Sequence, residues 1–95
     1  MQHFTGYQPQ TTPQFTLSGK WRVVWYCSPA RPEVSATLSA SLLDAQGQVT
    51  RTVTDGVLDA EGDIFNGYST SPERVSLQVF ASFMRYDFTV QEWSG

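Results

Sequence analysis

The chain has 95 residues, the size of one domain, because chains divide into several hydrophobic cores only well above this length. Six basic and nine acidic residues give a net charge of −3, and charged residues make up 16% of the sequence. This balance argues against a nucleic-acid-binding protein, whose affinity depends largely on Lys and Arg that neutralise phosphates, and against docking to an anionic membrane surface.

The sequence contains no apolar run of roughly eighteen residues, so we expect no membrane insertion. The first residues lack the basic start and apolar stretch of a signal peptide. This predicts either a cytoplasmic protein or an exported protein whose leader has been removed. A surface built mostly from Ser, Thr and Gln is more typical of exported proteins.

Residues 1–14 are predicted to be a flexible N-terminal tether, and residues 15–95 a single folded domain. The first segment is rich in Gln, Thr and Pro and has no Lys, Arg, Asp or Glu. Such a segment buries too little apolar surface to offset the entropy lost on ordering. Phe4 and Tyr7 are its exceptions, with enough apolar surface to dock on the domain or on a partner.

The stretch 19–27, GKWRVVWYC, is apolar on both faces of the strand that its two-residue period predicts. The face expected to be buried carries Trp21, Val23, Trp25 and Cys27. Val24 and Tyr26 then face the other way. Cys27 is the only cysteine, which excludes an intramolecular disulfide, and it fits a small buried residue better than a reactive thiol.

The same alternation predicts strands over 34–42, 74–83 and 86–93. Turn signals separate these runs: DAQG at 44–47, DG at 55–56, EGD at 61–63 and NG at 66–67. No helical period is evident. The fold class predicted is therefore all-β, an antiparallel β-sandwich of about seven strands, Ig-like or jelly-roll-like.

The strand predicted over 74–83 also has apolar residues on the side that should face outward. The buried face of this strand is predicted to carry Val75, Leu77, Val79, Ala81 and Phe83. Phe80 and Met84 then point outward, and so does Trp93 on the last strand. If these strands are neighbours, one exposed apolar patch results, and such patches usually mark interfaces. The predicted binding residues are Val24, Tyr26, Phe80, Met84 and Trp93.

Three occupants of this patch remain open. The N-terminal tether could fold back over it, a protein partner or second copy could cover it, or a ligand such as a sugar could stack on it.

The segment 55–63 is the one candidate for metal chemistry. Calcium binds oxygen ligands from several carboxylates. The spacing does not match the EF-hand loop, and Asp and Gly also occur in hairpin turns for conformational reasons alone. Solvated turns are the simpler interpretation, with calcium as the alternative. The candidate ligands are Asp55, Asp59, Glu61 and Asp63.

Catalytic chemistry has little support in the residues, and the chain is predicted not to be an enzyme. The only histidine, His3, lies in the predicted tether, away from any nucleophile that it could activate. The sequence has no phosphate-binding glycine loop, and one Cys with one His cannot make a zinc site. We therefore expect no cofactor.

The run FTLSGKWRVVWYC, followed near the C-terminus by YDFTVQEW, resembles small exported bacterial β-sandwich domains of the lipoprotein or membrane-tethered type. These domains have an early F-x-L-x-G-x-W-x-V-x-W strand, a closing aromatic-T-V strand and a polar N-terminal tether. The similarity covers residues 15–93. It implies a location at the cell envelope, and some such domains pair the early cysteine with a later one, for which Cys27 has no partner here.

These observations together predict a non-catalytic binding or assembly module of a bacterial cell envelope. Its apolar sheet face would bind a protein partner or a second copy, forming a homo-oligomer. One alternative is a carbohydrate-binding β-sandwich that uses the same aromatics for stacking. Another is a small phage or cytoplasmic accessory protein that binds a partner.

Overall fold

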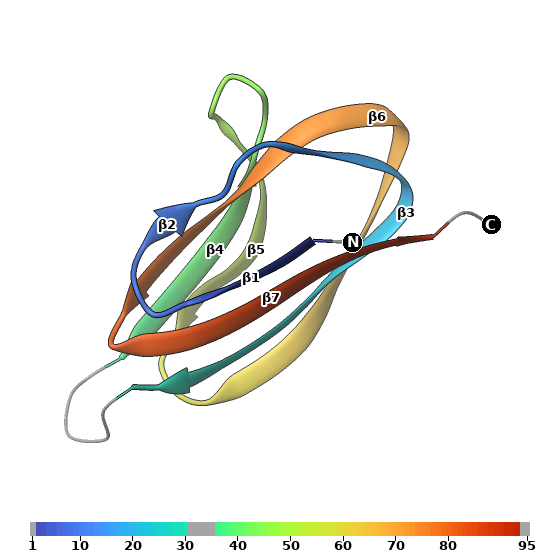
Figure 1. The fold of residues 1–95 in the computed structure, drawn as a ribbon. Helices are drawn as coiled ribbons and strands as arrows, with labels where there is room; N and C mark the ends of the chain where they lie inside the picture. The colour runs from blue at the N-terminus through green and yellow to red at the C-terminus, as the bar shows by residue number, and fades with distance from the viewer. Residues whose placement is uncertain (1, 31–35, 94–95) are drawn as a thin grey trace.

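The computed structural model describes residues 2–30 and 36–93, without the side chain of Trp93, and these residues form an all-β, antiparallel sheet of seven strands (Figure 1). The all-β, antiparallel prediction is therefore confirmed. The described residues contain no helix, and so none that could cross a membrane. The strands are β1 (Gln2–Gly6), β2 (Gln10–Thr11), β3 (Phe15–Pro29), β4 (Thr37–Leu43), β5 (Val49–Val57), β6 (Glu61–Ser82) and β7 (Met84–Trp93).

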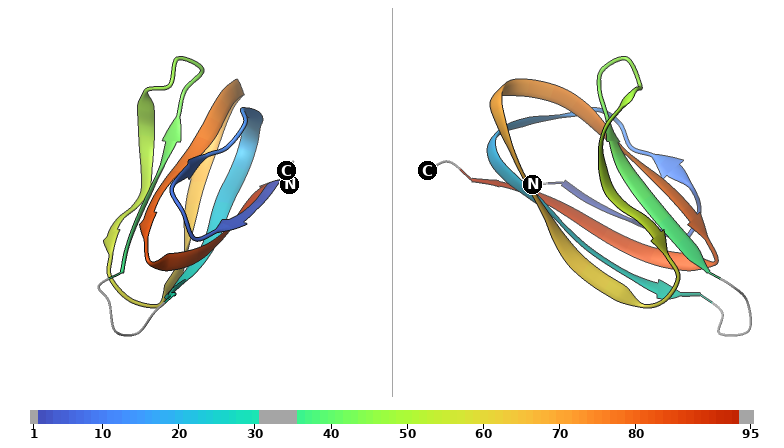
Figure 2. Two further views of the ribbon diagram at one scale, coloured as in Figure 1. Left: turned by 60° about the vertical axis from the view of Figure 1, so that its left-hand side comes forward. Right: turned by 180° about the vertical axis from the view of Figure 1, so that it is seen from behind.

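The strand order is β1-β7-β3-β6-β4-β5, and β2 pairs with β6 beside this path. β6 joins the two parts of the sheet, because residues 61–75 pair with β3 whereas residues 76–82 pair with β4. In the left view of Figure 2, β4 and β5 lie to one side of the molecule and β1 and β3 to the other. The sheet thus curls around one core, to which both parts contribute.

A bulge lies in β6 shortly before this change of partner. Leu17 of β3 is opposite Glu73, but Gly19 is opposite Ser69, so three residues of β6 stand against one of β3. Pro72 is among the three, and proline is tolerated at bulges because it has no N–H to give to the ladder. Gly19 has a φ of 64°, which glycine adopts without a Cβ clash.

Alternation along β3 builds the centre of the core, as predicted. Trp21, Val23 and Cys27 are fully buried, and Trp25 nearly so. The Trp21 indole N–H donates a hydrogen bond to Ser69 Oγ at 3.0 Å, which satisfies the one polar atom of this side chain.

The predicted tether is wrong over the described residues. β1 pairs with β7 along its whole length, and β2 pairs with β6. Phe4 packs against the core, 5.8 Å from Phe15 between ring centroids, whereas Tyr7 stays exposed. Backbone pairing at an open sheet edge orders a polar segment whose composition alone predicts disorder. Because β1 extends the sheet at its edge, it does not cover the exposed face of β3.

Phe83 is a second difference from prediction. It has a φ of 55°, a left-handed conformation that is uncommon for a bulky residue, and it stands alone between β6 and β7. This residue breaks the alternation, so Phe83 points out and Met84 points in. Met84 is therefore fully buried core and not a binding residue, which corrects the prediction for both positions.

The turn signals have mixed outcomes. Asp44–Gly47 is a turn, in which Asp44 Oδ1 accepts hydrogen bonds from the N–H groups of Gln46 and Gln48, both at 2.9 Å. The segments EGD at 61–63 and NG at 66–67 are not turns but parts of β6, opposite β3. Of the predicted strand 34–42, the first two residues lie outside the described part, Ala36 is buried, and β4 begins at Thr37.

Candidate functional site

The exposed side of the β1-β7-β3-β6 ladder is the candidate site, and we call it the outer face. Side chains opposite one another in an antiparallel pair share a face at about 4.5–5.5 Å between Cβ atoms. The register therefore aligns the outward residues of β3 with those of β6 and β7. The pairs of β3 with β6 are Lys20 with Tyr68, Arg22 with Asn66, Val24 with Ile64, and Tyr26 with Gly62.

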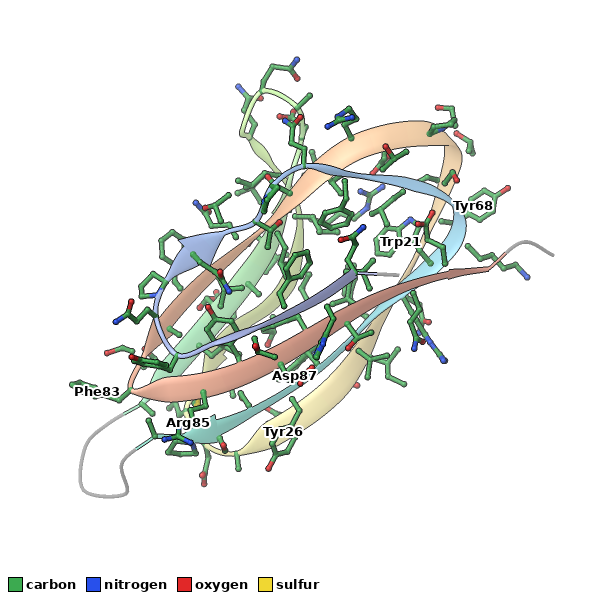
Figure 3. The ribbon with its side chains drawn as sticks, in the orientation of Figure 1. Trp21, Tyr26, Tyr68, Phe83, Arg85 and Asp87 are labelled. Atoms are coloured by element: carbon green, nitrogen blue, oxygen red, sulfur yellow. The ribbon has the colours of Figure 1, made fainter. Side chains whose placement is uncertain are left out.

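Three large apolar side chains of the outer face are exposed: Tyr26 by 57%, Ile64 by 46% and Tyr68 by 61%. Val24 lies between them and is half-buried. In Figure 3, Tyr26 and Tyr68 project from the ladder at well-separated points along it. The other side of β3 is buried in the core, and Phe65 of β6 packs against that core. The strands that carry the exposed side chains are therefore held in place.

Gly62 fits the ring of Tyr26. A β-carbon at position 62 would lie 3.3 Å from Tyr26 Cδ2 and 3.1 Å from the Trp25 carbonyl oxygen. The Tyr26 ring therefore lies against a strand position with no side chain. Aromatic residues opposite strand glycines cover the exposed backbone there in this way. Tyr26 is thus held in place without being buried.

The charge of the outer face differs from that of the whole protein. Lys20 and Arg22 lie on β3, and Arg85 lies on β7 opposite Ser28. The carboxylate on this part of β7 is Asp87, and it is 2.8 Å from His3 Nε2 on β1. In a chain with a net charge of −3, this face therefore has an excess of basic groups next to its aromatics.

The predicted patch does not assemble as one surface. Val24 and Tyr26 are together on the outer face. Phe80 is exposed but lies opposite Ser39 of β4, on the other part of the curled sheet. Trp93 is opposite Lys20 at the end of β7, and its side chain is outside the described atoms.

Two residues of the outer face, Ile64 and Tyr68, are not among the binding residues that the sequence predicts. The NG pair at 66–67 predicts a turn, which places these residues outside any predicted strand. The signal was present, because Ile64, Asn66 and Tyr68 alternate with Phe65 and with Gly67, which lies against Trp21.

The calcium alternative for residues 55–63 finds no support in the described residues. No group of three or more acidic, His or Cys side chains in residues 2–30 and 36–93 is arranged to hold a metal ion. The carboxylates bond locally instead: Asp55 accepts from Ser39 Oγ at 2.9 Å, Asp59 from the Ala60 N–H at 2.8 Å and Asp63 from the Ile64 N–H at 2.7 Å. The predicted ligands Asp55, Asp59, Glu61 and Asp63 therefore do not form one site.

Two titratable groups in the described part of the chain have shifted pKa values. Burial raises the pKa of the Cys27 thiol, which suppresses the reactive thiolate, in agreement with its predicted core role. Burial also raises the pKa of the Tyr86 phenol, whose hydroxyl donates a 2.6 Å hydrogen bond to the Gln8 carbonyl. Both groups stay protonated at neutral pH.

Comparisons of the chain with protein-family models, with curated proteins and with solved structures give no match. The geometry described above therefore carries the functional argument.

Proposed function

We propose that this protein is a non-catalytic binding module that attaches to a protein partner through the outer face. The observation that carries this proposal is the register of Tyr26, Ile64 and Tyr68. Two adjacent strands present them on one side, while the other side of β3 forms the core. In this register Val24 and Ile64 lie between the two tyrosines, so the exposed apolar side chains follow one side of the ladder. Exposed apolar surface of this kind is typical of interaction sites.

The energetics favour a protein partner. Fully burying a side chain of this size contributes about 1.5–3 kcal/mol, before the cost of association is subtracted. Tyrosine and arginine are enriched among the residues that dominate interface energies. Lys20 and Arg22 beside the aromatics favour an acidic partner surface, because complementary charge accelerates encounter and selects among partners. A second copy meeting face to face would oppose like charges.

On the same basis we propose that the curled sheet is a β-sandwich, Ig-like or jelly-roll-like, in a protein of the bacterial cell envelope. The core between the two parts of the sheet supports the sandwich. The polar surface composition and the resemblance to exported domains support the location. The carbohydrate-binding and the phage or cytoplasmic alternatives predict other ligands for the same outer face.

Site-specific photocrosslinking in the source cells tests the outer face. A photoreactive phenylalanine analogue replaces Tyr26 in one variant and Phe80 in the matched control, since both are exposed by 57%. We expect one specific crosslinked protein from position 26 and none from position 80. Equal products from both positions, or none from position 26, would contradict the proposal.

Molar mass in solution, measured by light scattering over a hundredfold range of concentration, separates the possible partners. A monomer agrees with a different protein as partner. A dimer that Tyr26→Ser dissociates, and Phe80→Ser does not, would replace that partner with a second copy. Retention on polysaccharide that Tyr26→Ser abolishes would favour the carbohydrate alternative.

A further inference from the structure

A groove lies at the corner where β6 turns into β7, at one end of the molecule. Its volume is about 430 Å³, and a smaller hollow of about 200 Å³ shares three of its lining residues, Tyr7, Gln8 and Pro9. Ala30, Phe83 and Arg85 line the rest together with Ala81. The larger volume falls within the range of sites for small molecules.

Hydrogen bonds to backbone carbonyls hold the walls of the groove. Tyr86, which lines the smaller hollow, donates its hydroxyl to the Gln8 carbonyl at 2.6 Å and so fixes the turn between β1 and β2. On the other side, the Ala30 N–H donates to the Phe83 carbonyl at 2.7 Å. The groove is therefore preformed, and a ligand would pay little to order it.

Both the backbone conformation and the solvent exposure of Phe83 are unfavourable for a large apolar residue. Its backbone has the left-handed φ of 55°, where glycine is normally found, and its ring is 48% exposed. Tyr7, across the groove, is exposed by 62%. Strained backbone at non-glycine residues concentrates at functional sites. The two rings offer apolar faces to a flat ligand.

Arg85 adds charge to this groove. In Figure 3 it lies close to Phe83 at this end of β7. Among the residues that the structure describes, its guanidinium has no hydrogen-bond or ion-pair partner, and the side chain is exposed. A guanidinium presents paired N–H donors whose geometry matches a carboxylate.

We propose that this corner groove binds a small carboxylic acid that carries a ring, with the carboxylate on Arg85 and the ring against Tyr7 and Phe83. Neither ring nor guanidinium is needed for the fold at this exposed position. The site is separate from the centre of the outer face, and its ligand is a small molecule. Ligand binding in this groove can therefore be tested separately from partner binding at the outer face.

Titration followed by NMR amide shifts tests the proposal on the full chain. The probes are phenylacetate and glucuronate, each compared with its uncharged counterpart, phenylacetamide or glucose. We expect at least one of the acids to bind with a Kd of about 1 mM, as for ligands of this size, and to shift amides around residues 7–9 and 81–85. The uncharged counterpart should bind about tenfold more weakly.

Three variants locate the site. Arg85→Gln should weaken binding of the acid about tenfold and leave that of the uncharged probe unchanged. Phe83→Gly should weaken both, without lowering Tm, because glycine accepts the left-handed φ. Tyr26→Ser, on the outer face, should bind as the wild type does. The proposal is overturned if acid and uncharged probe bind alike, if Arg85→Gln retains full affinity, or if neither acid saturates by about 10 mM.

Discussion

An alanine at position 67 would have no room for its β-carbon. Gly67 is opposite Trp21, and an added β-carbon would lie 2.6 Å from Trp21 Cε2 and closer still to Cζ2 and Cη2. Real β-carbons essentially never approach another atom within 3.0 Å. The indole cannot move aside easily, because it is fully buried and its N–H is bonded to Ser69. Gly67→Ala should therefore destabilise the fold.

The magnitude follows from two opposing effects. Overpacking a close-packed core typically costs about 1–3 kcal/mol. Relief of the backbone entropy of a strand glycine returns about 0.5–1 kcal/mol when no clash is present. For Gly67→Ala we expect a net loss of about 1–2 kcal/mol, or a decrease in Tm of at least about 4 °C in a domain of this size.

A double-mutant cycle with Trp21→Phe isolates the clash. Phenylalanine lacks the Cζ2 and Cη2 atoms of the indole, so in that background Gly67→Ala should be neutral or stabilise by up to about 1 kcal/mol. The cycle should give a coupling free energy of about 1–3 kcal/mol between the two positions. Trp21→Phe alone should also destabilise, because it opens a cavity and leaves Ser69 Oγ without its donor.

Urea denaturation of the four proteins, followed by tryptophan fluorescence and circular dichroism, measures these free energies. Coincident transitions for the two probes check two-state behaviour. A Gly67→Ala protein as stable as the wild type would refute the reasoning. An equal loss in both backgrounds would show that the cost does not come from the indole.

Three further predictions concern residues whose role differs from expectation or depends on pH. Met84→Ala should lower the free energy of unfolding in urea by about 2–5 kcal/mol, because this side chain is fully buried, whereas Phe83→Ala should change it by about 0.5 kcal/mol or less. Phe4→Ala should destabilise by about 1 kcal/mol, because its partly buried ring packs against the core, while Tyr7→Ala, at an exposed position, should not. Equal Tm values for the two variants would support a tether. Stability should fall above pH 10, since the folded state retains the Tyr86 phenol proton where the unfolded state loses it. A Tm series from pH 7 to 11 should show a shallower alkaline decline for Tyr86→Phe, and parallel curves would exclude this residue as the cause.

Much of the fold could be predicted from local patterns. Strict alternation identified the buried side of β3 and most of that of β6 and β7, because successive side chains of a strand point to opposite faces. Tyr26 and Val24 followed as the outward set. Ile64 and Tyr68 could not be recognised with equal ease, because Gly62 and Gly67 beside them have the composition of turns.

The sequence by itself determined the class of fold, the core of β3 and the existence of an apolar second face, since these depend on periodicity within one strand. Only the tertiary structure decided which strands are neighbours. It separated Phe80 from Tyr26, because β6 pairs with β3 up to Val75 and with β4 from Ser76 onward. It buried Met84 through the left-handed backbone of Phe83, and it ordered β1 through pairing with β7. Strand pairing and the left-handed backbone at Phe83 depend on residues distant in the chain. The alternation within one strand therefore does not reveal either of them.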